Sequence, residues 1–215
     1  MRTYEEIKAA MLAKGLKWFD GDLNLNLVFE RVDYVASNHF TDWWYFLYQE
    51  GGENKIVALH ATTKPGIRGS LDRVAQPLVD GVSGTPVIMP GQYRGAWEFI
   101  DIPVERAPIT ALEKVINCPY FRQVGPLNYW RDGNRDAVID EVNEQDGKEY
   151  STHLHPGSNE TDGRPWDQLE LNNWYEGCMG SPRREMDTIF DLVRRSVAIY
   201  GKLFTGTILE STDFN

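Results

Sequence analysis

Residues 42–63 read DWWYFLYQEGGENKIVALHATT, and they indicate the class of fold more directly than the rest of the chain. Two apolar runs, rich in aromatic and β-branched residues, flank the turn sequence Gly51–Asn54. Such runs favour strands, and a short glycine-rich turn between them favours an antiparallel hairpin. The sequence therefore predicts two paired strands in a mainly β protein.

The first run is unusually dense in aromatic side chains, which are Trp43, Trp44, Tyr45, Phe46 and Tyr48. Because successive side chains of a strand point to opposite faces, burial of one face explains half of them. The other half either stacks on sugar rings or packs beneath a second layer. Of these two alternatives, we favour packing.

Helical patterns and further strands surround this hairpin. Residues 3–15 follow helical spacing, begin with the Thr3 and Glu6 pair of a capping box, and end at Gly15. Apolar residues alternate with polar ones over residues 23–29, which predicts a half-buried strand. The N-terminal part of the chain is therefore expected to be a helix followed by β structure.

The clearest helical pattern lies near the C-terminus. Ser181 is a candidate N-cap, Pro182 suits the first helical position, and an apolar stripe runs over residues 186–200. Gly201 ends the helix, and LFTGTILE predicts a closing strand. We therefore expect a mainly β (α+β) chain, with an N-terminal helix in residues 1–20 and a single domain over residues 21–215.

Composition excludes several functional classes. The 215 residues have a formal net charge of -10, which argues against a nucleic-acid-binding protein with a basic face. Two cysteines do not make a disulfide framework, although a bridge from Cys118 to Cys178 stays open. The N-terminal residues lack the apolar core of a signal peptide, and no run is long enough for a membrane span. We therefore expect synthesis in the cytoplasm.

Cys178 is the candidate nucleophile, since Gly177 precedes it and Gly180 follows closely. A thiol needs a base to remove its proton, and His155 in the strand pattern EYSTHLHPG can supply one. His153 falls on the same face of that strand, because side chains alternate. The predicted helix after Cys178 would also favour a thiolate. The alternative is a buried structural thiol with a surface histidine.

Two motifs could bind a metal ion. His153 and His155 with Cys178 have ligand types suited to zinc, although no CxxC or HExxH accompanies them. Four oxygen-bearing residues of a polar segment also occupy calcium-loop positions, and they are Asp132, Asn134, Asp136 and Asp140. The position of the usual glycine is Ala137, so this segment is not an EF-hand. It is either an irregular calcium site or a solvated turn.

The motifs HLHPG and WYEGCMG together resemble the catalytic domain of L,D-transpeptidases. That family opens its motif with a histidine and closes it on Ser/Thr-His-Gly-Cys, which His155, Gly177 and Cys178 match. Glu176 stands where the family has a histidine. The segment GTPVIMPGQYRGAW resembles the family's Thr-Pro-x-Gly segment. More loosely, the chain is similar to phage-encoded relatives of this domain, and the whole resemblance covers roughly residues 30–210.

The resemblance implies a β-sandwich or barrel with a helix after the catalytic cysteine. It implies that Cys178 attacks a peptidoglycan stem peptide to form a thioester, that His155 is the general base, and that backbone N–H groups near Gly177 bind the oxyanion. His153 would orient the base or contact substrate. Glu176, Tyr93 and Arg94 would contact substrate. No cofactor is implied beyond the structural calcium considered above.

Without a signal peptide, such an enzyme would be a phage endolysin or a virion-associated lysin, with peptidoglycan and other virion proteins as partners. Transfer and hydrolysis share the acyl-enzyme step, so the residues leave both open. The altered residues before Gly177 also leave a second hypothesis, a non-catalytic virion or structural protein that keeps the fold.

Overall fold

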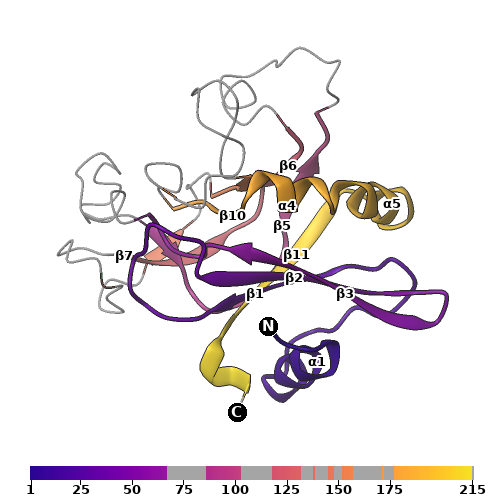
Figure 1. Ribbon diagram of the computed structural model, residues 1–215, viewed down its shortest axis with the longest axis horizontal. Helices are drawn as coiled ribbons and strands as arrows, with labels where there is room; N and C mark the ends of the chain where they lie inside the picture. Colours follow the sequence, from indigo (N-terminus) through magenta and orange to yellow (C-terminus); the bar gives the residue numbers. More distant parts are fainter. Residues whose placement is uncertain are drawn as a thin grey trace.

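The computed structural model describes residues 1–66, 86–102, 118–131, 138, 145–147, 152–156, 171 and 177–214. Within these residues the protein is mainly β, as predicted (Figure 1). The strands are β1 (Asn26–Arg31), β2 (Asp42–Glu50), β3 (Glu53–Ala61), β4 (Pro86–Ile88), β5 (Gly91–Ile100), β6 (Tyr120–Gln123), β7 (Leu127–Arg131), β8 (Gln145–Gly147), β9 (Leu154–Pro156), β10 (Met179–Ser181) and β11 (Leu203–Glu210). The helices are α1 (Tyr4–Ala13), α4 (Arg183–Asp187), α5 (Phe190–Tyr200) and the 3-10 helix η3 (Ser211–Phe214).

Eight strands form one barrel-like sheet in the order β10-β9-β6-β5-β11-β1-β2-β3. The two ends of this sheet meet where Thr62, just after β3, bridges Gly180 of β10. Each residue donates its N–H to the carbonyl of the other, at 2.8 and 3.2 Å. The sheet is therefore nearly closed, and a smaller sheet of order β4-β7-β8 accompanies it.

The predicted hairpin is confirmed, because β2 and β3 pair in an antiparallel register that ends at Glu50 and Glu53. Gly51 and Gly52 form the turn with φ values of 60° and 82°. Two consecutive positive φ values match a type I′ turn, whose twist suits a two-residue hairpin and which glycine adopts without strain. The backbone of this turn explains the glycine pair in the sequence.

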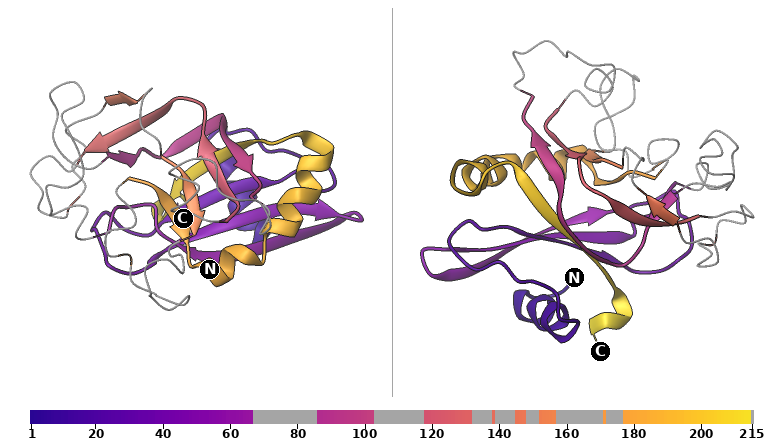
Figure 2. Two further views of the ribbon diagram at one scale, coloured as in Figure 1. Left: turned by 90° about the horizontal axis from the view of Figure 1, so that it is seen from above. Right: turned by 180° about the vertical axis from the view of Figure 1, so that it is seen from behind.

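Strand β1 differs from its prediction, because all six of its residues are buried. Leu27 and Phe29 belong to the main hydrophobic core. Val28, on the opposite face, packs with Ile7 and Met11 of α1. The strand is buried on both faces because α1 covers the side that alternation had suggested was exposed. Figure 1 shows α1 and α5 on opposite sides of β1–β3, and Figure 2 shows the same arrangement from behind.

Packing accounts for most of the aromatic run. Trp44 and Phe46 lie in the main core, while Tyr45 lies in the second core with α1. Trp43 is half-buried and its ring lies 4.6 Å from the ring of His60. The expectation that these side chains mainly pack is therefore confirmed for the three central residues.

The N-terminal helix is confirmed with its capping box, in which the Thr3 hydroxyl accepts from the N–H of Glu6 and the Glu6 carboxylate accepts from the N–H of Thr3. Gly15 follows it with a φ of 68°.

In the described part of the chain, no helix combines the length and apolar character needed to cross a membrane.

The C-terminal helix was predicted as one continuous helix, and that prediction is wrong. Ser181 is the last residue of β10, Pro182 takes the N-cap position without a side-chain cap, and the helix is divided into α4 and α5. Between them, the hydroxyl of Thr188 donates to the carbonyl of Glu185 at 2.6 Å. Such a bond competes with regular helical bonding. Gly201 ends α5 as expected, with a φ of 82°.

Candidate functional site

Strands β9 and β10 place the candidate residues side by side. They pair in parallel, with Leu154 opposite Met179 and His155 opposite Gly180. Leu154 and Met179 both belong to the main core. Because side chains alternate along a strand, the positions on either side of them face away from this core. His153 and His155 therefore share a face with Cys178, which precedes Met179.

The thiol of Cys178 takes part in the main-chain bonding of these strands. The N–H of Met179 donates to the carbonyl of His153 at 3.1 Å, which extends the parallel ladder by one step. In a regular ladder, the N–H of His153 would then donate to the carbonyl of Gly177. It donates instead to Sγ of Cys178, at 3.4 Å. The sulfur is thereby fixed at the edge of the sheet.

The conformation of Gly177 allows the N–H of His153 to donate to Sγ of Cys178. The φ of Gly177, 111°, lies in a region that side chains with a Cβ rarely adopt, and it turns the chain just before the thiol. A Cβ there would also lie 2.8 Å from Cγ and 3.2 Å from the carbonyl oxygen of Pro86. Glycine is therefore required both by the backbone conformation and by the close approach of β4.

A hydrogen bond to the main chain sets the tautomer of His155. Its Nδ1 lies 2.8 Å from the carbonyl oxygen of Pro156. A carbonyl only accepts, so Nδ1 holds the proton of this hydrogen bond. Burial lowers the pKa of His155 to about 4, so the ring is neutral near pH 7. In that tautomer, the lone pair of the ring is on Nε2, the atom through which a neutral imidazole accepts a proton.

His153 has the opposite tautomer. The backbone N–H of Gln123 donates to its Nδ1 at 3.2 Å, so the ring proton is on Nε2. Burial, together with the nearby His155 and Arg122, lowers the pKa of His153 to about 4. The ring is therefore neutral and offers a donor at Nε2. The main-chain N–H of His153 contacts Sγ of Cys178.

The expectation that a helix N-terminus close to Cys178 favours its thiolate is wrong. Strand β10 and Pro182 separate Cys178 from α4, and α4 has only five residues. The structure places the N–H of His153 on Sγ of Cys178. Hydrogen bonds to a charged acceptor are stronger than those to a neutral one. This N–H takes the part that the helix was expected to play.

Apolar side chains line one side of the thiol. Cys178 is half-buried and packs with Phe40 and Leu171. The N–H of Leu171 donates to the carbonyl of Asn38 at 2.7 Å, so this contact is held by the main chain.

Neither Cys118 nor Cys178 forms a disulfide, which removes the alternative of a bridge between them. Cys118 is buried, and burial raises its pKa to about 12.

Several residues of the site gave no signal in the sequence. Gln123, Thr152 and Tyr129 form a hydrogen-bonded group beside His153, and the indole of Trp97 joins it. They lie on four different segments of the chain. No local motif links them, because only the pairing of β5, β6 and β9 brings them together.

The remaining sequence candidates are placed elsewhere or lie outside the described residues. The hydroxyl of Tyr93 donates to the carbonyl of Met89 at 2.8 Å, and burial raises its pKa to about 12. Arg94 is exposed. Outside the described residues lie Glu176 and the calcium candidates Asp132, Asn134, Asp136 and Asp140. Where the structure is described, no three His, Cys, Asp or Glu side chains converge on a metal site.

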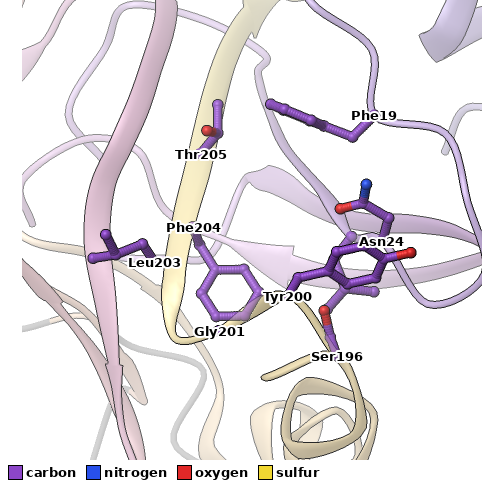
Figure 3. A pocket seen from close by; sticks show the side chains of 9 residues that line it. Phe19, Asn24, Ser196, Tyr200, Gly201, Leu203, Phe204 and Thr205 are labelled. Carbon is purple, nitrogen blue, oxygen red and sulfur yellow. The ribbon is translucent and has the colours of Figure 1, made fainter. Parts of the chain in front are cut away.

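The described residues form cavities away from the cysteine, and two of these lie beside α5. One of about 60 Å³ lies between the C-terminal end of α5, the start of β11 and residues 19–25 (Figure 3). It has room for about two water molecules. A wider groove of about 580 Å³ lies between the end of β5 and α5. None of the sequence candidates lines either cavity, so neither adds to the site around Cys178.

Comparison with known proteins gives no match to a family model, a curated protein or a solved structure. Function is therefore inferred from the geometry around Cys178, together with the motif resemblance.

Proposed function

We propose that the protein is a cysteine-dependent enzyme that acts on the stem peptides of bacterial peptidoglycan, as a murein peptidase or an L,D-transpeptidase-like enzyme. The observation that supports this most is the tautomer of His155. Its Nδ1–H donates to the carbonyl of Pro156, so the lone pair of the ring is on Nε2, and strand alternation puts His155 on the same face as Cys178. A neutral imidazole beside a thiol is the usual means of forming a nucleophilic thiolate.

The spacing of β9 and β10 suits this partnership. His155 and Cys178 are diagonal neighbours on paired strands, for which strand spacing and rise give about 8 Å between Cβ atoms. An imidazole and a thiol that lean toward each other can bridge that span. Directly opposite His155 is Gly180, which has no side chain to occupy the intervening space.

The reaction then follows from these roles. Nε2 of His155 takes the thiol proton, and Sγ adds to the carbonyl carbon of a stem-peptide bond. The tetrahedral adduct collapses to a thioester, the C–N bond breaks, and the leaving amine takes the proton from His155. Water or a second amine then attacks the thioester, which regenerates the thiol. The first outcome is hydrolysis and the second is transpeptidation.

The oxyanion requires donors that the sheet has not already used. The N–H of Met179 donates to His153, and the N–H of Gly180 donates to Thr62. These two groups are therefore committed to holding β10. We assign the oxyanion donors to backbone N–H groups near Gly177 and Cys178, as the resemblance implies.

The substrate class comes from the motif resemblance, and with it the setting. We propose a phage endolysin or virion-associated lysin with peptidoglycan as its partner. The reaction described above needs no cofactor. A calcium ion bound by residues 132–140 would be structural.

The test is digestion of purified muropeptides, with the products identified by mass. Wild type is expected to give new cleavage or exchange products, and Cys178→Ala none. The matched control is Cys118→Ala, which removes the other, buried cysteine and should leave the product profile unchanged. Equal product profiles for wild type and Cys178→Ala would remove the thiol mechanism.

The alternative is a non-catalytic virion or structural protein with the same fold. The packing of Cys178 with Phe40 and Leu171 is the observation that favours it, since a structural thiol would pack in the same way. Iodoacetamide separates the two. A nucleophile activated by His155 alkylates faster than an ordinary thiol at neutral pH, whereas a structural thiol alkylates slowly.

A further inference from the structure

The pairing of β6 with β9 stops just before it reaches the candidate site. Phe121 opposite Leu154 is the one registered pair of these antiparallel strands. The next pair on the same hydrogen-bonding side would be Gln123 with Thr152, because backbone groups alternate in direction along a strand. At that position, hydrogen bonds that involve side chains replace the backbone-to-backbone bonds of the ladder.

Gln123 supplies most of this replacement. Its Oε1 accepts from the N–H of Thr152 at 2.8 Å, and its own N–H donates to Nδ1 of His153 at 3.2 Å. The carbonyl of Thr152, which the ladder would have used, accepts from Nε1 of Trp97 at 3.0 Å. Residues Thr152 and His153 are thus held on the β6 side by three bonds, each involving a side chain.

The amide of Gln123 is itself fixed in orientation. Its Nε2 donates to the carbonyl of Gly125 at 2.9 Å, which identifies the other end as the oxygen. That oxygen also accepts from the hydroxyl of Tyr129 at 3.1 Å. Tyr129 in turn lies 2.9 Å from the hydroxyl of Thr152. The side chain of Gln123 therefore has little freedom to follow a displacement of Thr152.

On the opposite side, the same short segment holds the thiol. The N–H of His153 donates to Sγ of Cys178, and its carbonyl accepts from Met179. Thr152 and His153 thus connect Gln123 directly to the sulfur. We propose that Gln123 is a positioning residue, which fixes the segment before β9 so that the N–H of His153 stays on Sγ of Cys178. This inference rests on the proposed thiol chemistry, but its test does not need the substrate.

The test replaces Gln123 by methionine, which has a similar length but cannot accept from Thr152 or Tyr129. Two quantities are measured on the full chain. The first is the rate of iodoacetamide alkylation at Cys178, located by peptide mass. The second is the pair of ¹⁵N signals of the His153 ring. We expect alkylation to slow by about tenfold or more, and the ¹⁵N signals of the His153 ring to shift because the segment that carries it moves relative to β6.

Gln92→Met is the matched control. Gln92 makes the same kinds of bond on β5, since its Oε1 accepts from the N–H of Lys17 at 3.0 Å and its Nε2 donates to the carbonyl of Lys17 at 2.8 Å. Gln92→Met should lower the free energy of unfolding in urea as Gln123→Met does. Its Cys178 should alkylate at the wild-type rate. Gln123→Glu keeps an acceptor for Thr152, so it should recover most of the rate lost in Gln123→Met.

Each outcome decides the proposal. If Gln123→Met alkylates at the wild-type rate with unchanged ¹⁵N signals of the His153 ring, or if Gln92→Met slows alkylation equally, Gln123 has no positioning role. Iodoacetamide contains no cell-wall peptide, so these results are independent of the muropeptide digestion. A reactive Cys178 that depends on Gln123 but cleaves no muropeptide would uphold the positioning role and overturn the proposed substrate.

Discussion

His155 of β9 and His153, just before that strand, hold their ring protons on different nitrogens. Nδ1 of His155 faces a carbonyl, which can only accept, whereas Nδ1 of His153 faces an N–H, which can only donate. Both rings are neutral near pH 7, because burial lowers both pKa values. The hydrogen-bond partner of each ring therefore determines which histidine can accept the thiol proton at Nε2.

The first prediction separates the two rings by the same substitution. His155→Gln removes the base, so turnover should fall by about 10²–10⁴-fold. His153→Gln keeps both an acceptor for Gln123 and the backbone N–H on Sγ, so its loss should be well under that of His155→Gln. Muropeptide turnover measures both. A greater loss in His153→Gln would reverse the assignment of the base.

The second prediction concerns Gly177. Gly177→Ala forces a Cβ against Pro86 at a φ of 111°. Strain and overpacking together should lower the free energy of unfolding by roughly 2–4 kcal/mol. Urea unfolding is the measurement. The control is Gly15→Ala, which has a φ of 68° but nothing within 4 Å, so it should cost only about 1–2 kcal/mol. Equal costs would show that Pro86 can yield.

Strands β5 and β11 influence the site through one large side chain. Their register shifts between Phe204 and Gly206. A Cβ on Gly206 would lie 2.5 Å from Cζ3 of Trp97. The indole of Trp97 fits against the bare backbone of β11 and reaches the carbonyl of Thr152 at its other end. The glycine in LFTGTILE is therefore linked to the segment that holds Cys178.

The third prediction tests that link. Gly206→Ala must displace Trp97, so it should lower the free energy of unfolding by about 1–3 kcal/mol and also slow alkylation of Cys178. The control is Thr3→Ala, which loses the cap of α1 and about 1 kcal/mol, with no change in alkylation. A stability loss in Gly206→Ala with wild-type alkylation would show that Trp97 does not act on the thiol.

In the molecule as a whole, buried charges hold the barrel closed near the cysteine. Arg31 donates from Nε to the hydroxyl of Thr63 at 2.9 Å and from Nη2 to the carbonyl of Ile88 at 2.8 Å. Asp42 accepts from the N–H and the hydroxyl of Thr63, both at 2.8 Å. Thr63 follows Thr62, which bridges β10. This polar network therefore lies next to the residue at which the sheet closes on β10.

Sequence patterns could predict the parts of this structure that depend on neighbours in the chain. The hairpin and the capped α1 follow from spacing over a few residues, and so does the short strand β9 with His155. His153, which was predicted in the same strand, lies just before β9. The burial of β1 could not be predicted, because α1 covers it only in the folded molecule. The tautomers could not be predicted either, since Gln123 meets His153 only through the pairing of β6 and β9.

The same burial makes the stability of the whole molecule depend on pH. Burial lowers the pKa of His153 and His155 to about 4, whereas an unfolded histidine titrates near 6.5. Below pH 6.5 the unfolded chain therefore binds more protons, so the free energy of unfolding falls as the pH falls toward 4. Carboxylates with a lowered pKa, such as that of Glu98, add losses only below their ordinary value of 4.5.

The fourth prediction uses that pH interval. Between pH 7 and pH 5, each buried histidine should remove about 2 kcal/mol from the free energy of unfolding. Urea unfolding of wild type at the two pH values measures the sum of these losses. A variant with both His153→Gln and His155→Gln has no buried imidazole to protonate, so it should lose much less over the same interval. Equal losses in the two proteins would mean that the protons bind elsewhere, and the neutral rings on which the assigned base depends would lose their support.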